Sequence, residues 1–108
     1  RLTAQEKTEI VEMAQALRYR KHEYMLIKYF SGKMRAITSH NQNHVCLPRL
    51  RTDRIKIMLH NHPGTVCYPS LMDRVVVRGI AGVAGVYGEN QVKRRCEVYV
   101  YYQGEKSL

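Results

Sequence analysis

The sequence has only three cysteines among its 108 residues, and an odd number excludes a framework in which every cysteine is paired within the chain. No two cysteines are spaced as C-x-x-C, so the usual signature of a structural zinc site is absent too. We therefore predict a reducing compartment, in which Cys67 is a small buried or loop thiol without a role at a metal.

Long apolar runs are also absent from the sequence. No stretch approaches the roughly 18–20 consecutive apolar residues that a membrane-spanning helix needs, and no leader with a small-residue cleavage site is visible. The 44% hydrophobic content is nevertheless sufficient for one compact core. We expect a soluble chain without a membrane partner, organised as a single domain over residues 1–108.

Acidic residues are scarce compared with basic ones. Nine Asp and Glu stand against eighteen Lys and Arg, and the formal charge of +9 attracts anionic partners such as nucleic acid, acidic protein surfaces or anionic lipid. The basic residues include three clusters, within residues 18–21, 49–54 and 93–95. No signature of a DNA- or RNA-binding module accompanies them, so nucleic-acid binding is an alternative and not the main prediction.

The N-terminal segment carries the strongest helix signal. Thr3 and Glu6 match a capping box, and apolar residues then recur at helical spacing, so we predict a helix over about residues 4–19. The rest of the chain is mostly strand-like, with branched and aromatic residues separated by turn residues. We predict strands at 24–30, 34–39, 55–60, 83–87 and 96–102, a turn at 88–91 and an unassigned connection at 40–54.

The strand that begins at Ile55 runs into Pro63 and Gly64, neither of which continues a central strand. We therefore predict a loop there, followed by a short helix for which Ser70 is the N-cap. Together these elements predict an α+β fold of sandwich-like form. It combines a mixed β-sheet with the N-terminal helix and the short helix after the loop.

Two histidines lie where this strand gives way to the loop. His60 and His62 are two residues apart on an extended chain, so their side chains project from one face, about 6–7 Å apart, and can turn toward one metal ion. A catalytic zinc usually takes three protein ligands and leaves a fourth position for water. Asp73 is the only carboxylate between Asp53 and Glu89, so we predict His60, His62 and Asp73 as ligands of Zn²⁺.

Each half of this motif also has a simpler interpretation. Two histidines at the end of a strand are more often polar loop residues than ligands. Ser70-x-x-Asp73 is the pattern of a capping box, in which both side chains accept hydrogen bonds from backbone N–H groups. The joint spacing favours a metal site, because seven residues separate His60-x-His62 from Ser70-x-x-Asp73.

The segment from His60 to Asp73, HNHPGTVCYPSLMD, resembles the motif of the JAB/JAMM (MPN-type) metalloproteases, an upstream glutamate followed by H-x-H-x7-S-x-x-D. Its HNHP start is similar to the RadC-like branch and to JAB modules attached to bacterial toxins, although Gly64-Thr65 stands where RadC-like proteins usually have Ser-Gly. The resemblance covers roughly residues 20–102. It implies a cytidine deaminase-like, JAB-type architecture and a location in the bacterial cytoplasm.

In that family the two histidines and the aspartate bind zinc, the serine helps to stabilise the oxyanion, and the glutamate is the general acid and base. The resemblance therefore implies Ser70 as the oxyanion donor and a peptide or isopeptide bond of a protein as the substrate. It implies Glu23 as the glutamate, because Glu23 opens the apolar segment that leads into the predicted hairpin. Glu6, Glu9 and Glu12 lie on the predicted helix, where roles as caps or solvated charges explain them.

Other interpretations are compatible with the sequence. In one, a JAB-like fold keeps the metal site but binds DNA or a protein partner through its basic surface, without peptidase activity. In another, suggested by the start at Arg1, the chain is an excised toxin or effector module. In a third it is an inactive structural domain. For Glu23, the alternative is a surface charge beside Lys21 and His22.

Overall fold

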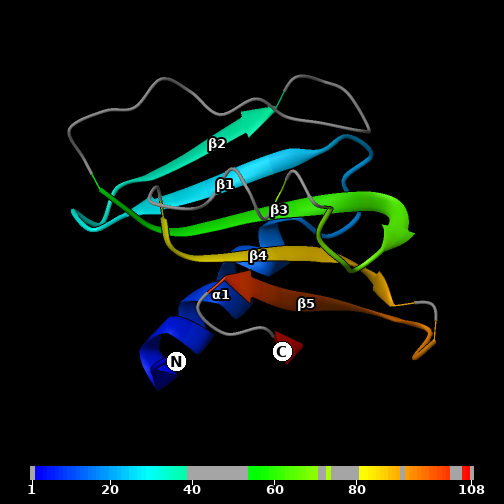
Figure 1. Ribbon diagram of the computed structural model, residues 1–108. Helices are drawn as coiled ribbons and strands as arrows, with labels where there is room; N and C mark the ends of the chain where they lie inside the picture. Colours follow the sequence, from blue (N-terminus) through cyan, green and yellow to red (C-terminus); the bar gives the residue numbers. More distant parts are fainter. Residues whose placement is uncertain are drawn as a thin grey trace.

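The computed structural model describes residues 2–38, 54–70, 73, 81–90, 92–102 and 106–107. These residues form an α+β fold in which one helix, α1 (Ala4–Ala16), lies against a sheet (Figure 1). The strands are β1 (Tyr24–Tyr29), β2 (Met34–Thr38), β3 (Ile55–Val66), β4 (Ala81–Asn90), β5 (Arg95–Tyr102) and the two-residue β6 (Lys106–Ser107).

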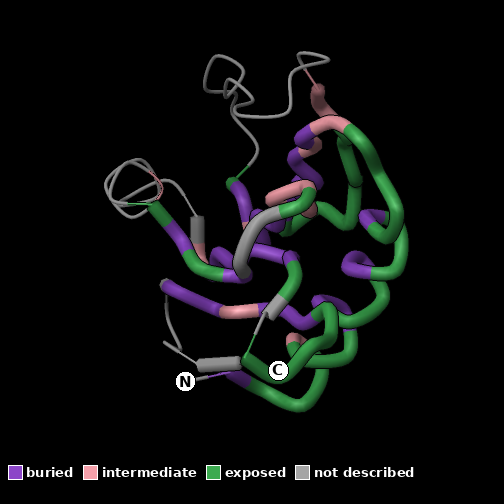
Figure 2. Tube along the Cα trace, turned by 90° about the vertical axis from the view of Figure 1, so that its right-hand side faces the viewer, coloured by how far each residue is buried: buried purple, intermediate pink, exposed green. Residues whose placement is uncertain are grey.

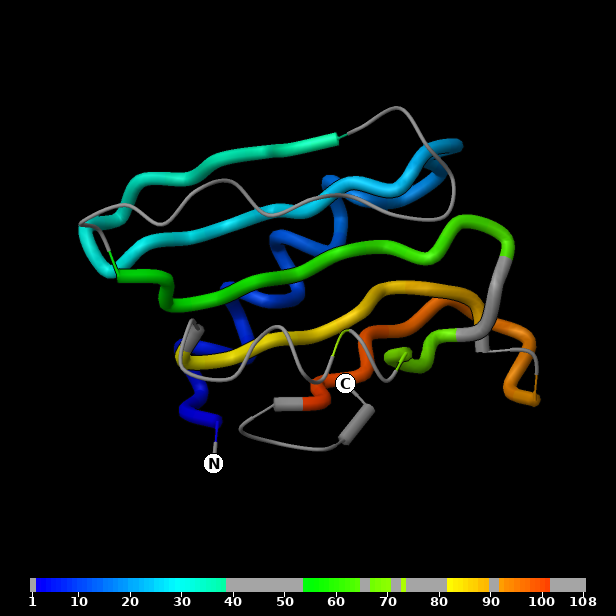
Figure 3. Tube along the Cα trace, turned by 45° about the horizontal axis from the view of Figure 1, so that its top comes forward, coloured from blue at the N-terminus to red at the C-terminus, as the bar shows by residue number. Residues whose placement is uncertain are grey.

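The sheet is mixed, as predicted. Its strands follow the order β2-β1-β3-β4-β5-β6, and Figure 3 shows β2 to β5 side by side with α1 behind them. β3 and β4 run parallel, whereas every other neighbouring pair is antiparallel. Among the described residues, no helix is long and apolar enough to cross a membrane.

Helix α1 begins with the predicted capping box. The Glu6 N–H donates to the Thr3 hydroxyl at 3.1 Å, and the Thr3 N–H donates to the Glu6 carboxylate at 2.9 Å. The helix ends at Ala16, three residues before the predicted end at residue 19. A turn follows, and its last residue, Tyr19, has a left-handed φ of 62°, which a helix cannot accommodate.

Alternating strand residues give the sheet two apolar faces. On the face that α1 covers, Ile10 packs into one buried cluster with Leu59. The opposite face carries a second buried cluster, which includes Met25, Met58 and Tyr101. Figure 2 shows buried positions along the strands and exposed ones in the turns. The sheet therefore forms the centre of the structure, and α1 covers only one side of it.

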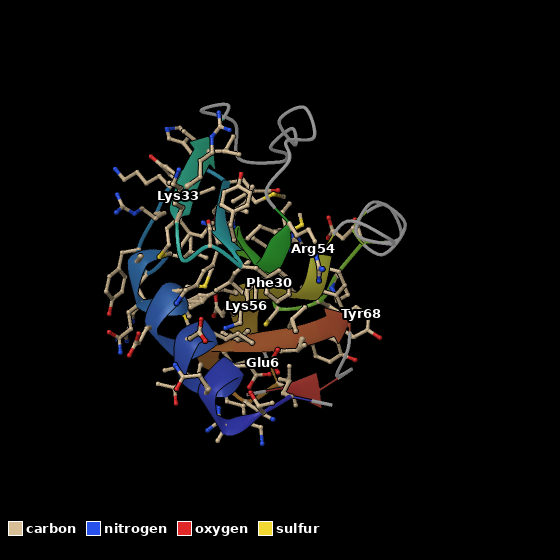
Figure 4. The ribbon with its side chains drawn as sticks, turned by 90° about the vertical axis from the view of Figure 1, so that its left-hand side faces the viewer. Glu6, Phe30, Lys33, Arg54, Lys56 and Tyr68 are labelled. Atoms are coloured by element: carbon tan, nitrogen blue, oxygen red, sulfur yellow. The ribbon has the colours of Figure 1, made fainter. Side chains whose placement is uncertain are left out.

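A buried carboxylate ties α1 to the sheet. Glu9 is only 4% exposed, and its two carboxylate oxygens lie 2.6 Å from Lys28 Nζ on β1 and 2.8 Å from Lys56 Nζ on β3. Lys56 lies at the boundary between the sheet and the helix (Figure 4). The expectation that Glu9 is a cap or a solvated charge is wrong, because its position on α1 faces the sheet.

Replacing Glu9 by Gln is expected to lower the free energy of unfolding at neutral pH by about 1–3 kcal/mol, because both lysines lose a charged partner. Hydrogen bonds from Lys28 and Lys56 hold the pKa of Glu9 below its ordinary value of 4.5. This stabilisation is therefore complete above the ordinary pKa and is lost as the pH falls through the lower pKa of the folded state. Urea unfolding of both proteins at neutral and acidic pH measures the difference.

The Glu12→Gln variant provides the control, because it makes the same change at an exposed position of α1. We expect its stability to stay within about 0.5 kcal/mol of the parent at both pH values. A difference between Glu9→Gln and the parent that does not shrink on acidification would contradict the role of the ion pairs.

β3 differs from its prediction at its C-terminal end. The strand continues through Pro63 and Gly64 to Val66, so the prediction that it stops before them is wrong. Its pairing with β4 is irregular here, because His62 pairs with Gly88 and Val66 pairs with the next residue of β4. The additional residues of β3 form a bulge, which the positive φ of Gly64, 68°, accommodates. His62 is therefore the last residue before the regular ladder breaks.

The connection between β4 and β5 also differs from its prediction. Gly88 and Glu89 pair with Glu97 and Cys96, so they extend β4 and do not form the predicted turn at 88–91. The turn lies at 92–94. The predicted strands 24–30 and 34–39 are confirmed as β1 and β2. The connection predicted at 40–54 and the short helix after Ser70 lie outside the described residues, apart from Arg54 and Asp73 at their margins.

Candidate metal centre

The three predicted metal ligands converge at one point. His60 and His62 lie on β3 immediately before the bulge, and Asp73 reaches them from beyond the strand. The two Nε2 atoms are 3.0 Å apart, and Asp73 Oδ2 lies 3.3 Å from His60 Nε2 and 3.5 Å from His62 Nε2. These three residues form a group that can hold a metal ion.

The spacing of the three atoms fits tetrahedral coordination. Two ligand atoms bound to zinc at 2.0–2.1 Å with a tetrahedral angle are separated by about 3.3 Å. The observed separations of 3.0, 3.3 and 3.5 Å therefore outline one face of such a tetrahedron. Three protein ligands on one face leave the fourth corner open for water or a substrate.

The group has a buried and an accessible side. The His60 side chain is 3% exposed, and its ring lies 6.1 Å from the ring of Tyr101 on β5. The side chains of His62 and Asp73 are 18% and 22% exposed. His60 thus forms the floor of the site, while the other two ligands keep one side in contact with solvent.

Ser70 orients the Asp73 carboxylate. The Ser70 N–H donates to Asp73 Oδ2 at 2.8 Å, and the Asp73 N–H donates to Ser70 Oγ at 3.1 Å. These reciprocal bonds are those of the capping box that the sequence predicted, and Asp73 itself is helical. Capping and metal ligation are therefore compatible here, because the bond from Ser70 fixes the oxygen that faces the histidines.

Electrostatics keep this carboxylate ionised. Burial alone would raise the pKa of Asp73, but hydrogen bonds from His60 and His62 and from the Ser70 backbone hold that pKa well below its usual range. An ionised carboxylate beside two imidazoles is a suitable set of donors for a divalent transition ion.

Glu23 lies just before β1 and is buried, with 6% of its surface exposed. The alternative of a surface charge is therefore wrong. β1 pairs antiparallel with β3, and Met25 pairs with His60. This pairing ends at Met25 and His60, and Glu23 precedes Met25 by two residues. Residues two apart on an extended chain project to the same side, so we expect the Glu23 side chain on the side of Met25, which pairs with His60.

The other candidate glutamates lie on α1, which covers the opposite face. Glu6 belongs to the capping box and Glu9 pairs with two lysines, while Glu12 is exposed. Glu23 is therefore the one upstream glutamate that does not lie on α1.

Sequence reasoning missed two residues that contact the segment around Glu23. Asn61 is 4% exposed, and its side chain forms hydrogen bonds to the backbone of His22 and Tyr24. Thr38, on β2, donates from Oγ1 to the Glu23 carbonyl at 2.9 Å. The position of Asn61 between the two histidines was the only signal in the sequence, and it says nothing about a partner on another strand.

Cys67 is buried, as predicted. Its Sγ lies 2.8 Å from the Glu97 carbonyl oxygen and 3.2 Å from that of Val86, so the single thiol proton has two acceptors within reach. Burial raises the pKa of this thiol to about 11, so it is protonated near neutral pH. Among the described residues, Cys67 and the exposed Cys96 are free thiols.

Alkylation of the folded protein at about pH 8 is expected to modify Cys96 and to spare Cys67, because only thiolates that the reagent can reach react at a useful rate. Peptide mass spectrometry after treatment with iodoacetamide measures both sites separately. Unfolding in urea should make Cys67 reactive as well. Rapid labelling of Cys67 before unfolding would contradict its buried, protonated state.

Comparisons of the chain with models of known protein families and with curated proteins found no match.

Proposed function

We propose that this protein is a zinc-dependent hydrolase of amide bonds, with His60, His62 and Asp73 as the metal ligands. The observation that carries the proposal is the triangle formed by the two Nε2 atoms and Asp73 Oδ2, which matches one face of a zinc tetrahedron. Zinc is favoured because two imidazoles and one carboxylate are a usual donor set for this ion in catalytic sites.

When bound, zinc supplies the Lewis acidity that lowers the pKa of a water molecule to about 7. The Glu23 carboxylate accepts a proton from the attacking water and returns it to the nitrogen of the leaving amine. The Ser70 hydroxyl accepts a hydrogen bond from Asp73, so its own proton is available to donate to the oxyanion of the substrate. Burial of Glu23 limits competition from bulk water at this carboxylate.

The proposed family is JAB/JAMM. The motif implies a cytidine deaminase-like architecture and a relation to the RadC-like branch or to toxin-associated JAB modules. Its support is the motif itself, the histidines near the end of a central strand of a mixed sheet and the helix on the opposite face. The proposed substrates are peptide or isopeptide bonds in proteins, and the proposed compartment is the bacterial cytoplasm.

The test combines metal analysis with a panel of peptide and isopeptide substrates. We expect one zinc ion per chain, hydrolysis of at least one substrate, loss of activity with a chelator and recovery when zinc is restored. A His60→Ala variant should neither retain zinc nor turn over. Stoichiometric zinc without hydrolysis of any substrate would remove the hydrolase, and absence of zinc binding would remove the metal centre.

A second candidate function is binding of nucleic acid, and the placement of the basic clusters favours it. The start of β1, the end of β3 and the β4–β5 turn all lie at one end of the sheet (Figure 3). We call this end, where His60 and His62 lie, the histidine edge. Exposed basic residues of segments 18–21 and 93–95 therefore flank the histidine edge from two sides. Arg54, from the third cluster, lies at the opposite end of β3, where its guanidinium is 4.7 Å from the Phe30 ring (Figure 4).

Fluorescence anisotropy with a labelled DNA duplex separates this function from the first. Binding through phosphates should weaken steeply with salt and should not respond to a chelator. Arg94→Glu, at the histidine edge, should weaken binding more than Arg54→Glu, the same change at the opposite end. Equal effects of the two variants, or binding that ignores salt, would remove this candidate.

A further inference from the structure

Side chains from the neighbouring strands hold backbone groups of three consecutive residues, His22, Glu23 and Tyr24, where β1 begins. Asn61 Nδ2 donates to the His22 carbonyl at 3.1 Å, and Asn61 Oδ1 accepts from the Tyr24 N–H at 2.6 Å. Thr38 Oγ1 donates to the Glu23 carbonyl, which lies between them, at 2.9 Å. The residue at the centre of all three bonds is Glu23.

We propose that Asn61 and Thr38 are positioning residues that hold Glu23 beside the metal ligands. This inference rests on the proposed function, because it assigns the purpose of the three bonds to the acid and base of that reaction. We call the two side chains the Glu23 clamp.

The chemistry of asparagine suits this task. A primary amide carries an acceptor and donors on adjacent atoms, so Asn61 can bind a carbonyl and an N–H of the same segment at once. Asn61 is 4% exposed, which removes competition from water and makes each unsatisfied group expensive. Aspartate lacks the donor, and alanine lacks both groups, so neither reproduces the two bonds.

The position of Asn61 couples the clamp to the metal site. On β3, residues 60 and 62 face the metal and residue 61 faces the other way, so one three-residue segment supplies two ligands and the main part of the clamp. A shift of β3 therefore moves the ligands and the Glu23 segment together. Such coupling matters because a displacement of about 1 Å at a catalytic group can reduce the rate by about 10²-fold.

The first test does not require a substrate. In the cobalt-loaded protein, paramagnetic broadening of the Glu23 side-chain NMR signals reports their distance from the ion. We expect strong broadening in the parent and clearly weaker broadening in Asn61→Ala and in Thr38→Val, with cobalt affinity within about threefold of the parent. Thr8→Val is the matched control, because Thr8 is exposed and its hydroxyl donates to the Ala4 carbonyl within α1.

The second test is kinetic. Asn61→Ala should lower kcat by about 10–100-fold with KM little changed, and Thr38→Val should act in the same direction. The reason is that residues which contact a catalytic group, and not the substrate, affect the position of that group without contributing to substrate binding. In a Glu23→Gln background, Asn61→Ala should cause no further loss. A residue that only stabilises the fold would instead lower activity equally in both backgrounds.

The outcomes separate the two proposals. Unchanged broadening of Glu23 in both clamp variants, or additive losses in the double variants, would overturn the positioning role even if the protein is a hydrolase. Absence of turnover in every protein, the parent included, would remove the proposed function, while the cobalt experiment still decides the placement. Thr38→Val, at a half-buried position, keeps the inference testable if Asn61→Ala does not fold.

Discussion

Replacing Asp73 by Ala is expected to lower the affinity for zinc by more than about 10²-fold. Mutating a residue that only hydrogen-bonds to a metal ligand already lowers metal affinity by about 10–100-fold, so removing a ligand should cost more. The variant removes the carboxylate of the three-residue group and leaves two imidazoles whose Nε2 atoms are 3.0 Å apart. It also removes the negative charge that compensates the ion in a site with a buried floor. Competition with a chromogenic chelator measures the affinity.

Asp73 also caps the segment that follows Ser70, so a control must separate capping from ligation. Asp73→Asn keeps a side-chain oxygen for the Ser70 N–H but is a poor ligand, so its stability should resemble the parent while its zinc affinity falls. Glu89→Ala, at an exposed position of β4, should leave the affinity unchanged. Parent-like affinity in both Asp73 variants would show that this residue does not bind the metal.

Replacing Glu23 by Gln is expected to reduce turnover by about 10²–10⁴-fold while zinc remains bound, because the amide cannot accept and return a proton. The two side chains have the same shape, so the buried position is filled and the backbone bonds from Asn61 and Thr38 are retained. Measurement of kcat at saturating substrate, together with zinc content, checks the effect. The loss should appear in kcat more than in KM.

Glu12→Gln and Glu6→Gln test whether the effect belongs to Glu23 alone. Both change a glutamate on α1, on the opposite face of the sheet, and both should keep parent-like turnover. Equal rates for Glu23→Gln and the parent would remove Glu23 from the chemistry. The metal centre would survive that result, since Glu23 is not among the three ligands.

The grouping of the three candidate metal ligands could be predicted from the sequence because their relation is mostly local. Side chains two residues apart on a strand share a face whatever the rest of the chain does, so His60 and His62 follow from the strand that contains them. Asp73 required the joint spacing with Ser70 as well. The capping box at Thr3 and Glu6 was predicted for the same reason, since all of its atoms lie within one turn of helix.

The incorrect predictions lie where contacts with another strand determine the conformation or burial of a residue. Pro63 and Gly64 are poor strand residues, yet the chain around them still pairs with β4 because a bulge absorbs them. Gly88 and Glu89 read as a turn but are held extended by β5. Glu9 has the sequence context of a solvated charge, and only the lysines of β1 and β3 make its burial tolerable.

By itself, the sequence determined the composition of the site and the α+β class, because residue spacing and periodic apolar patterns act within single elements. Tertiary structure showed that Glu23 is buried and revealed the bonds of Asn61 and Thr38 to the backbone around it. The physical reason is that hydrogen bonds between strands join residues from 15 to 39 positions apart, and register, which no local pattern encodes, selects these pairs.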